Sequence, residues 1–462
     1  MKRYYAGLDL GTSSVKLMLV REDGEIQKSK QTYTDRTPGG WFAAIRGAVE
    51  ELGKEIDLTQ IAAIGLSSQV GTYITDTGTV LHWNDPVGAQ ELAEIKAQIP
   101  QATFIRELAM AHPDLISYPL PRLLHIKRTD PACREVLMPK ELLLREMTGR
   151  TVTDRFSQRG IAHTVTGQYT ALIQTLGLTF ALPLVAEPTD LGGHITPRGA
   201  QTFGLPTGIP VYVGCNDFFA GLLGMGVLEE GTLFDLTGTS EHIGLISSDR
   251  TDGPLVSGPY FAHHVTYGGT KASGVSSSFA MRNFGIADVD IRVLANDPPL
   301  FLPYLTGERA PIYDEAARGV FFGIGADTDQ RDMAYAVLEG IVYSLYHIAA
   351  QFPDGAYDRM IVGGGAAADP LMGYLKAELF GCPVDIAAEP DASALGAAML
   401  AMVGNGHCKT LADAAAQTVK HTTLAVPDGK YRSLLQKRYQ IYRELYGHLR
   451  EDFSRFAKIR EQ

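Results

Sequence analysis

The chain has 462 residues, of which 45% are hydrophobic and 20% are charged, a composition typical of a globular protein long enough for two domains. Its formal net charge of −11, without a basic cluster, argues against a nucleic-acid partner. The four cysteines lack metal-binding spacing, which favours free thiols and a cytoplasmic location. Apolar runs are too short or too interrupted for a signal peptide or a membrane span, so we expect no membrane segment.

The chain opens with a predicted β-hairpin. Two apolar runs, Tyr5–Leu10 and Ser14–Val20, flank the small residues Gly11-Thr12-Ser13, which favour a tight turn. The backbone N–H groups and hydroxyls of such a turn suit a phosphate, and the carboxylate of Asp9 suits a hydrated Mg²⁺. Taken alone, the pattern also fits an ordinary hairpin with a polar turn, which is the simpler interpretation.

The rest of the first half alternates strands with helices. These elements are expected over 26–33, 41–53, 61–67 and 73–83, followed by a mainly helical region over about 85–205. Within that region, Arg155 and Arg159 fit either a solvated face or the wall of a pocket. The solvated face is the simpler interpretation.

A carboxylate stands at a predicted strand–helix junction. Ile209–Gly214 has the pattern of a buried strand, and a glycine-rich helix is expected from Phe218 onwards. Asp217 therefore lies where α/β proteins bind ligands. Aspartate is also a good helix N-cap, and the junction by itself does not distinguish the two roles.

The hairpin motif occurs twice. Asp9-Leu10-Gly11-Thr12-Ser13 is matched by Asp235-Leu236-Thr237-Gly238-Thr239-Ser240, and an apolar run stands on both sides of each. A single repeat of this kind predicts two halves of similar architecture, each with a phosphate-type hairpin near its start. Chance similarity of two polar turns is the alternative.

A predicted buried strand in the second half is followed directly by glycines. After a predicted Gly-rich loop over Tyr267–Thr270, a helix over Ser276–Phe284 and an amphipathic helix over Asp332–Ala350, the buried strand Met360–Val362 runs into Gly363-Gly364-Gly365-Ala366. Further helices are expected over 370–380, 391–403 and 431–458. A strand, glycines and a helix in this order let the backbone approach a nucleotide at the helix N-terminus.

Together, two phosphate-holding hairpins, a glycine-rich nucleoside seat and one carboxylate describe a site for ATP and phosphoryl transfer. This reaction needs positioning, charge neutralisation by a metal and a base for the attacking hydroxyl. The sequence predicts an α/β protein in which ATP and Mg²⁺ are the cofactors.

The motifs resemble those of the FGGY carbohydrate kinase family, with xylulokinase and gluconokinase among its members. The similarity covers nearly the whole chain and rests on segments that we list here: DLGTSSVK at Asp9–Lys16, GCNDFFAG at Gly214–Gly221, LTGTS at Leu236–Ser240, FLPYLTGERAP at Phe301–Pro311, GVFFGIGADTDQRDMAYAVLEG at Gly319–Gly340 and GGGAAADPLMGYLKAELFGCPV at Gly363–Val384. The resemblance implies two ribonuclease H-like (actin-like ATPase) domains, 1–225 and 226–462. Each would be a mixed five-stranded sheet with helices on both faces, with a cleft between the domains.

The departures from the family pattern fall in the sugar-binding half. Gln69-Val70-Gly71-Thr72 stands where xylulokinase-like members carry Gln-Met-His-Gly, and Trp83-Asn84-Asp85-Pro86-Val87 lacks the arginine of the usual Trp-x-Asp-x-Arg. After Asp217 this chain has Phe218, whereas the xylulokinase pattern at these two positions resembles Asp-Asn. The family's Lys and Trp are also missing from the segment Pro121-Arg122-Leu123-Leu124-His125. The sequence therefore leaves the acceptor open: a ketose such as a pentulose, a polyol or a sugar acid.

The resemblance implies a role for each candidate residue. Asp217 is the expected general base and contacts the substrate, and Asp9 is the expected metal ligand. The expected nucleotide contacts are Gly11, Thr12, Ser13, Lys16, Gly238, Thr239, Gly363, Gly364, Gly365 and Ala366, and the expected sugar contacts are Gln69, Trp83 and Asp85. A catalytically inactive nucleotide-binding regulator and a chaperone- or filament-type ATPase of the same superfamily are the alternatives. The sequence does not decide the oligomeric state, and a homodimer is one option.

Overall fold

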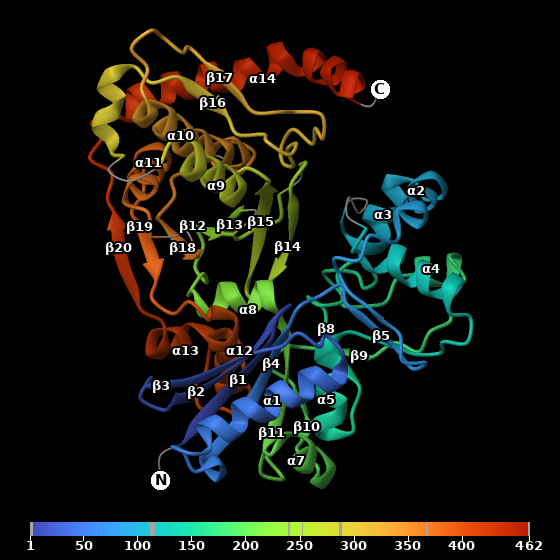
Figure 1. Cartoon of the computed structure of the whole chain (residues 1–462). Helices are drawn as coiled ribbons and strands as arrows, with labels where there is room; N and C mark the ends of the chain where they lie inside the picture. Colours follow the sequence, from blue (N-terminus) through green and yellow to red (C-terminus); the bar gives the residue numbers. More distant parts are fainter. Residues whose placement is uncertain are drawn as a thin grey trace. The chain divides into compact units, whose positions relative to one another are not determined.

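The computed structural model describes residues 3–110, 116–238, 241–251, 253–285, 289–353, 355–365 and 368–460. The chain divides into two compact units (Figure 1). Unit 1 consists of Met1–Leu228 with Asp391–Val419, and unit 2 of Glu229–Pro390 with Lys420–Gln462. The first boundary lies close to the expected one. The expected unbroken second domain over 226–462 differs from the structure, because Asp391–Val419 packs with unit 1.

In the described part of unit 1, the main sheet has six strands in the order β10-β11-β4-β1-β2-β3, one more than the expected five. Its strands are β1 (Tyr4–Leu10), β2 (Ser14–Arg21), β3 (Ile26–Thr32), β4 (Ile61–Ser68), β10 (Leu191–His194) and β11 (Pro210–Asn216). The predicted N-terminal hairpin is confirmed, since β1 and β2 pair antiparallel. β4 lies parallel to both β1 and β11, so the carboxyl ends of these three strands meet at one edge.

Helices cover both faces of this sheet (Figure 1). They are α1 (Pro38–Leu52), α5 (Pro139–Thr148), α7 (Pro197–Phe203), α8 (Asp217–Gly224), α12 (Ala392–Gly404) and α13 (Leu411–Thr418). Leu8 and Leu10 of β1 share a core with Trp41 and Ile45 of α1. Gly7, which comes directly before Leu8, faces α12 on the opposite side of the sheet, as the alternation of a strand requires.

Glycines let α12 approach the sheet of unit 1 very closely. A Cβ atom on Gly7 would lie 1.8 Å from the carbonyl oxygen of Ala394, and one on Gly65 would lie 1.9 Å from that of Ala397. The helix is rich in alanine and glycine, so its backbone reaches the strands. This close packing is the physical reason why Asp391–Val419 belongs to unit 1.

The region between β4 and β10 carries small sheets and helices. Its elements are β5 (Tyr73–Thr75), β6 (Val80–Leu81), α2 (Ala89–Gln98), α3 (Gln101–Leu108), α4 (Pro119–Thr129), β7 (Val136–Leu137), β8 (Val152–Asp154), α6 (Leu172–Thr175) and β9 (Leu184–Ala186). The expected hairpin at 73–83 is confirmed by the pairing of β5 with β6. Pro100 separates α2 from α3, because proline lacks an N–H group and cannot continue a helix.

In the described part of unit 2, the main sheet has seven strands in the order β14-β15-β13-β12-β18-β19-β20, where five were expected. They are β12 (Thr232–Thr237), β13 (Glu241–Ser247), β14 (Val256–Tyr260), β15 (His263–Thr270), β18 (Arg359–Gly364), β19 (Val384–Ala387) and β20 (His421–Ala425). Tyr267–Thr270, expected in a loop, lies in β15, where it pairs with β13 despite its two glycines. As in unit 1, one strand, β12, pairs antiparallel with the next and parallel with a later one, β18.

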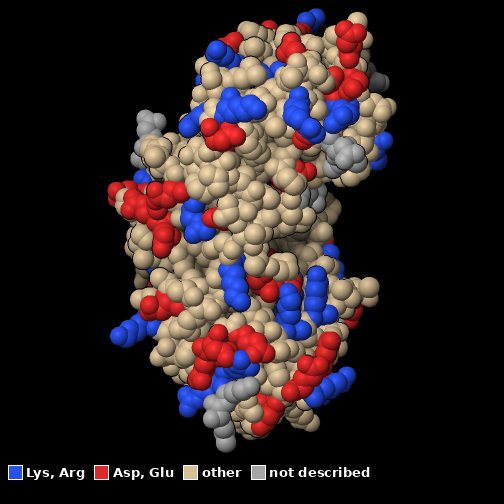
Figure 2. All heavy atoms as spheres, turned by 90° about the vertical axis from the view of Figure 1, so that its left-hand side faces the viewer, with Lys and Arg blue, Asp and Glu red and all other residues tan. Residues whose placement is uncertain are grey.

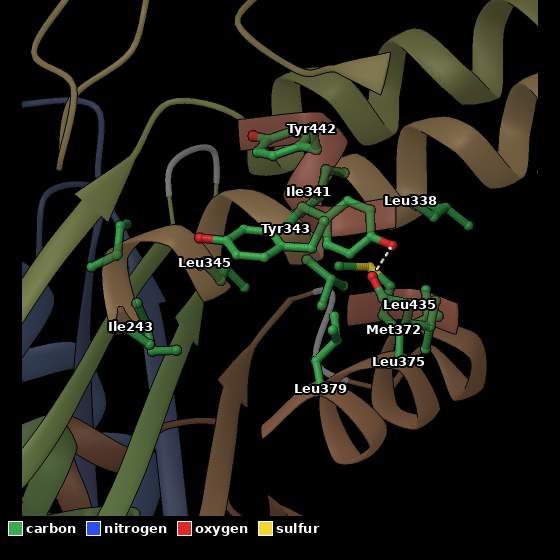
Figure 3. Packing of buried hydrophobic residues seen from close by; sticks show 14 of the residues in the cluster. Ile243, Leu338, Ile341, Tyr343, Leu345, Met372, Leu375, Leu379, Leu435 and Tyr442 are labelled. Atoms are coloured by element: carbon green, nitrogen blue, oxygen red, sulfur yellow. Dashed lines mark hydrogen bonds between the residues drawn. The ribbon is translucent and has the colours of Figure 1, made fainter. Parts of the chain in front are cut away.

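The core of unit 2 is built around α10 (Gln330–Ala349). Side chains of α11 (Pro370–Phe380) and α14 (Arg432–Arg460) converge on Ile341 and Tyr343 of this helix (Figure 3). The Tyr343 hydroxyl donates to the Leu435 carbonyl over 2.9 Å. The helix is buried around most of its circumference, so the expected amphipathic helix is a central one. Unit 2 also contains α9 (Ser273–Asn283), β16 (Leu300–Leu302) and β17 (Val320–Phe322).

A buried ionic cluster joins three elements of unit 2. The Lys376 ammonium of α11 donates to Asp235 of β12 and, over 3.1 Å, to Glu241 of β13. All three side chains are almost fully buried. Burial alone would lower the pKa of Lys376, but Asp235 and then Glu241 raise it overall, so the ammonium stays charged.

Charges of both signs are interspersed over the face drawn in Figure 2. Among the described residues, none of the helices is both long enough and apolar enough to cross a bilayer.

Replacing Gly7 by alanine should destabilise unit 1 by about 3 kcal/mol, because the new methyl group meets the Ala394 carbonyl and forces α12 off the sheet. Urea denaturation followed by circular dichroism measures the loss. Gly447→Ala is the matched control, since nothing lies within 4 Å of its Cβ position and it is exposed on α14. That control should be neutral or stabilising, and equal effects of the two changes would contradict the close approach.

Replacing Lys376 by methionine should lower the free energy of unfolding of unit 2 by about 3 to 5 kcal/mol, because two buried carboxylates lose their cation. The same denaturation experiment measures this change. Lys437→Met, on the exposed side of α14, removes a lysine without removing an ion pair of this kind. A loss no larger than that of the control would show that the cluster does not stabilise the fold.

Candidate active site

Three strands bring distant candidate residues to one edge of the unit 1 sheet. In the strand register, Asp9 of β1 and Cys215 of β11 both pair with Ser67 of β4. Gln69 and Asp217 follow β4 and β11 at this same edge. The parallel pairing therefore brings the predicted metal ligand, sugar contact and base to the carboxyl ends of neighbouring strands, the usual ligand-binding edge of an α/β sheet.

The Asp9 carboxylate is held by three donors from separate parts of unit 1. Lys16 of β2 donates to Oδ2 over 2.9 Å, Ser67 of β4 donates to Oδ1 over 2.9 Å, and Ser393 of α12 donates to Oδ2 over 2.6 Å. Burial tends to lower the pKa of Lys16, but the nearby Asp9 carboxylate raises it overall. Lys16, expected at the nucleotide, thus pairs with Asp9. Ser393 was not identified in the sequence, since nothing in its local pattern connects it with Asp9.

The hydrogen bonds of Asp9 leave room for one more contact. A carboxylate oxygen accepts about two hydrogen bonds; Oδ2 already accepts two and Oδ1 only one. Within the described ranges, no three or more His, Cys, Asp or Glu side chains cluster as a metal cage. The site fits a Mg²⁺ ion that keeps most of its water molecules and meets Asp9 through one of them, as this ion commonly does.

Asp217 is the first residue of α8, and its neighbour caps the helix. The Asn216 Oδ1 atom accepts the backbone N–H of Phe219 over 2.9 Å, so the N-cap role that was open for Asp217 belongs to Asn216. Burial first, and the negative charge of Asp9 second, raise the pKa of Asp217 to about 7, while the Phe218 N–H and Lys16 act in the opposite direction. A carboxylate with this pKa is suited to accept a proton near neutral pH.

Two aromatic residues form hydrogen bonds with the tip of the first hairpin. Tyr33 donates its N–H to the Ser13 carbonyl over 3.1 Å and its hydroxyl to the Gly11 carbonyl. Trp83 donates its indole N–H to the Thr12 hydroxyl over 3.1 Å. Tyr33 lies next to a strand that was expected, but the sequence pattern did not connect it with the turn.

The candidate sugar contacts differ in how they are bonded. Gln69 is buried, and neither polar atom of its carboxamide has a hydrogen-bond partner in the described part of the chain. Asp85 accepts the backbone N–H of His82 over 2.7 Å and so closes its own turn. Trp83 is 41% exposed, and its indole N–H is directed at Thr12. Of the three, Gln69 alone has a buried polar group left to satisfy.

Arg155 and Arg159 are both only partly exposed. Arg155 pairs with Glu187 over 3.1 Å and lines a cavity of about 610 Å³. The Arg159 guanidinium lies over the Phe219 ring, 5.1 Å from its centroid. Each arginine therefore contacts the protein rather than forming a fully solvated face.

The second hairpin and the glycine run lie side by side in unit 2. Leu236 pairs with Gly363 and Thr237 with Gly364 in the parallel register of β12 and β18. Gly364 has φ +98°, and a Cβ atom there would lie 2.0 Å from the Thr237 carbonyl oxygen, so this position requires glycine.

Exposed backbone is concentrated at this end of the two strands. Gly238, Gly364 and Gly365 are all exposed, and glycines present their N–H groups without side chains in the way. The candidate residues Thr239 and Ala366 lie outside the described residues.

Sequence comparison supports the resemblance over both halves of the chain. The FGGY family of carbohydrate kinases, N-terminal domain, matches residues 4–224, and its C-terminal domain matches residues 236–404. A xylulose kinase of Escherichia coli strain K12 is 28% identical, over 96% of this chain and 99% of its own. A gluconokinase of Bacillus subtilis strain 168 is 24% identical, over 94% of each chain.

Structure comparison shows the same fold. The gluconate kinase from Lactobacillus acidophilus superimposes with a TM-score of 0.87 at 24% identity, covering 99% of this chain and 100% of its own. The ligand-bound xylulose kinase from the same organism gives a TM-score of 0.86. The predicted fold class, two domains of the actin-like ATPase type, is confirmed. The chain belongs to the FGGY family of carbohydrate kinases and is a sugar kinase.

Proposed function

We propose that the protein transfers the γ-phosphate of ATP to a hydroxyl group of a small sugar, with Asp217 as the general base. The observation that carries this proposal is the partly buried Asp217 carboxylate beside Asp9, with a pKa near neutrality. Asp217 would accept the proton of the attacking sugar hydroxyl, while the oxygen of that hydroxyl forms a bond to the γ-phosphorus. The bond from that phosphorus to the bridging oxygen breaks, and ADP leaves.

Each hairpin would supply part of the ATP site. Gly11, Thr12 and Ser13 offer backbone N–H groups and hydroxyls to the terminal phosphates, and Gly238 and Thr239 offer the same groups from unit 2. The glycines Gly363–Gly365, of which Gly364 and Gly365 are exposed, would with Ala366 seat the adenosine and the α-phosphate. Mg²⁺, when bound, neutralises phosphate charge. Asp9 would hold its hydration shell, and Lys16 would then act on the phosphates through Asp9 rather than by direct contact.

The acceptor is proposed as a ketose, polyol or sugar acid. The relatives are named xylulose kinase and gluconokinase, so D-xylulose and D-gluconate belong in the first assay. The unsatisfied carboxamide of Gln69 is the contact that we expect from unit 1. A coupled assay of ADP release over pentuloses, hexuloses, polyols and aldonic acids tests the proposal. ATP binding without turnover on any acceptor would favour the inactive regulator instead.

Two further expectations stay predictions. The sequence favours a cytoplasmic location, and a homodimer is one option for the assembly. Sedimentation of the purified protein would decide the oligomeric state. Neither property enters the chemistry assigned to Asp217.

Asp217→Asn should reduce kcat by about 10²- to 10⁴-fold, because an amide cannot accept the hydroxyl proton. ATP affinity, measured by calorimetry, should be nearly unchanged. Asp190→Asn, an aspartate of the cavity beside Arg155, is the control. Turnover of Asp217→Asn close to that of the wild type would rule out this base.

The dependence of kcat/KM on pH should show the raised pKa of Asp217. The group is the active base only when ionised, so kcat/KM should level off about one pH unit above a pKa of about 7 and should fall by about tenfold per pH unit well below it. An ordinary aspartate would place this fall near its usual pKa of about 4. Initial rates at saturating ATP between pH 5 and 9 measure the profile, and the residual rate of Asp217→Asn should lack the fall.

A further inference from the structure

Trp83 is fixed at three points although its ring is partly exposed. Its backbone N–H donates to the buried Thr72 hydroxyl over 3.2 Å, and its carbonyl accepts from Nη2 of Arg122 over 2.8 Å. Its indole N–H donates to the Thr12 hydroxyl over 3.1 Å. The first two contacts fix the backbone, so the side chain leaves the turn at 83–85 in a defined direction.

Arg122 holds this turn from inside the fold. The side chain is fully buried. Nη2 also donates to the Asp85 carbonyl over 2.8 Å, and Nε donates to the Ile116 carbonyl over 3.0 Å. Gly71 makes space on the other side, since a Cβ atom there would lie 3.2 Å from the Cβ of Trp83. The departure of this loop from the usual Trp-x-Asp-x-Arg therefore leaves it anchored, by an arginine that comes from α4.

The bond between Trp83 and Thr12 has a fixed direction. An indole N–H group donates and cannot accept, whereas a hydroxyl accepts and also donates one hydrogen. Because Thr12 accepts from Trp83, its own hydrogen must point to another acceptor. A hydroxyl that accepts one hydrogen bond is also a stronger donor in the next. At the tip of a phosphate-type hairpin, that acceptor would be an anionic phosphate oxygen.

We propose that Trp83 is a positioning residue for the ATP donor: its indole N–H orients the Thr12 hydroxyl toward the terminal phosphate. This rests on the proposed function, because it takes the first hairpin as a phosphate site. It changes the role expected for Trp83, whose polar group serves the phosphate hairpin and not the sugar. The acceptor loop and the donor hairpin are thus linked by one hydrogen bond inside unit 1.

Trp83→Phe tests the link, since it keeps an aromatic ring and removes the indole N–H donor. Calorimetry with a non-hydrolysable ATP analogue should show a Kd raised by about three- to tenfold, and the Kd of AMP should not change. Thr12→Val should also weaken binding of the analogue. Adding Trp83→Phe to Thr12→Val should have no further effect, since the two side chains act through one bond. Tyr313→Phe, which removes a hydrogen bond of another exposed aromatic side chain, is the matched control and should leave the Kd unchanged.

Fluorescence adds a readout that does not depend on turnover. The chain has two tryptophans, and Trp41 is fully buried, so the emission that Trp83→Phe removes belongs to Trp83. This component should change on titration with the ATP analogue, at the same Kd as in calorimetry, and should respond less in Thr12→Val.

The result that would overturn the inference is an unchanged analogue Kd in Trp83→Phe, whether or not the KM of the acceptor rises. Additive effects in the double variant would overturn it too. A wild-type protein that binds the analogue but phosphorylates no acceptor would refute the proposed function. Calorimetry on the same variants would still decide the role of Trp83.

Discussion

The organisation of unit 1 depends on the hydrogen bonds to one buried carboxylate. Asp9 is the next-to-last residue of β1, and its three donors come from β2, β4 and α12. A buried charge is tolerated only when it is paired and hydrogen-bonded, so the three elements must assemble correctly for the site to form. The same negative charge helps to raise the pKa of Asp217. One carboxylate thus connects the assembly of the fold with the chemistry at its edge.

The two halves use the same strand arrangement for different purposes. Asp9 and Asp235 both lie on the first strand of a sheet, beside an antiparallel partner and a parallel one. Asp235 is paired with the buried ammonium of Lys376, whereas Asp9 accepts from three donors and has Asp217 nearby. The repeated motif therefore has a structural aspartate in unit 2 and a candidate functional one in unit 1.

The acceptor side is where this chain departs from the family pattern, and its bonding shows how the departures are accommodated. Arg122, from the segment that lacks the family's Lys and Trp, holds the backbone of the turn that carries Trp83. Gly71 leaves space for that turn. Gln69 retains a buried carboxamide without partners in the described residues. Specificity for the sugar is therefore expected to depend on Gln69 and the anchored turn more than on the phosphate hairpins.

The sequence by itself determined the two hairpins, the strand–helix junction at Asp217, the glycine run and the family, because each is a local pattern of a few neighbouring residues. It did not determine that Ser393 holds Asp9, that Arg122 holds Trp83, or that Asp391–Val419 packs on the first sheet rather than the second. It also predicted a loop at Tyr267–Thr270, where pairing with β13 overrides the local preference of glycine. Only the tertiary structure decided these points, since contacts between residues tens to hundreds of positions apart depend on strand register and close helix packing.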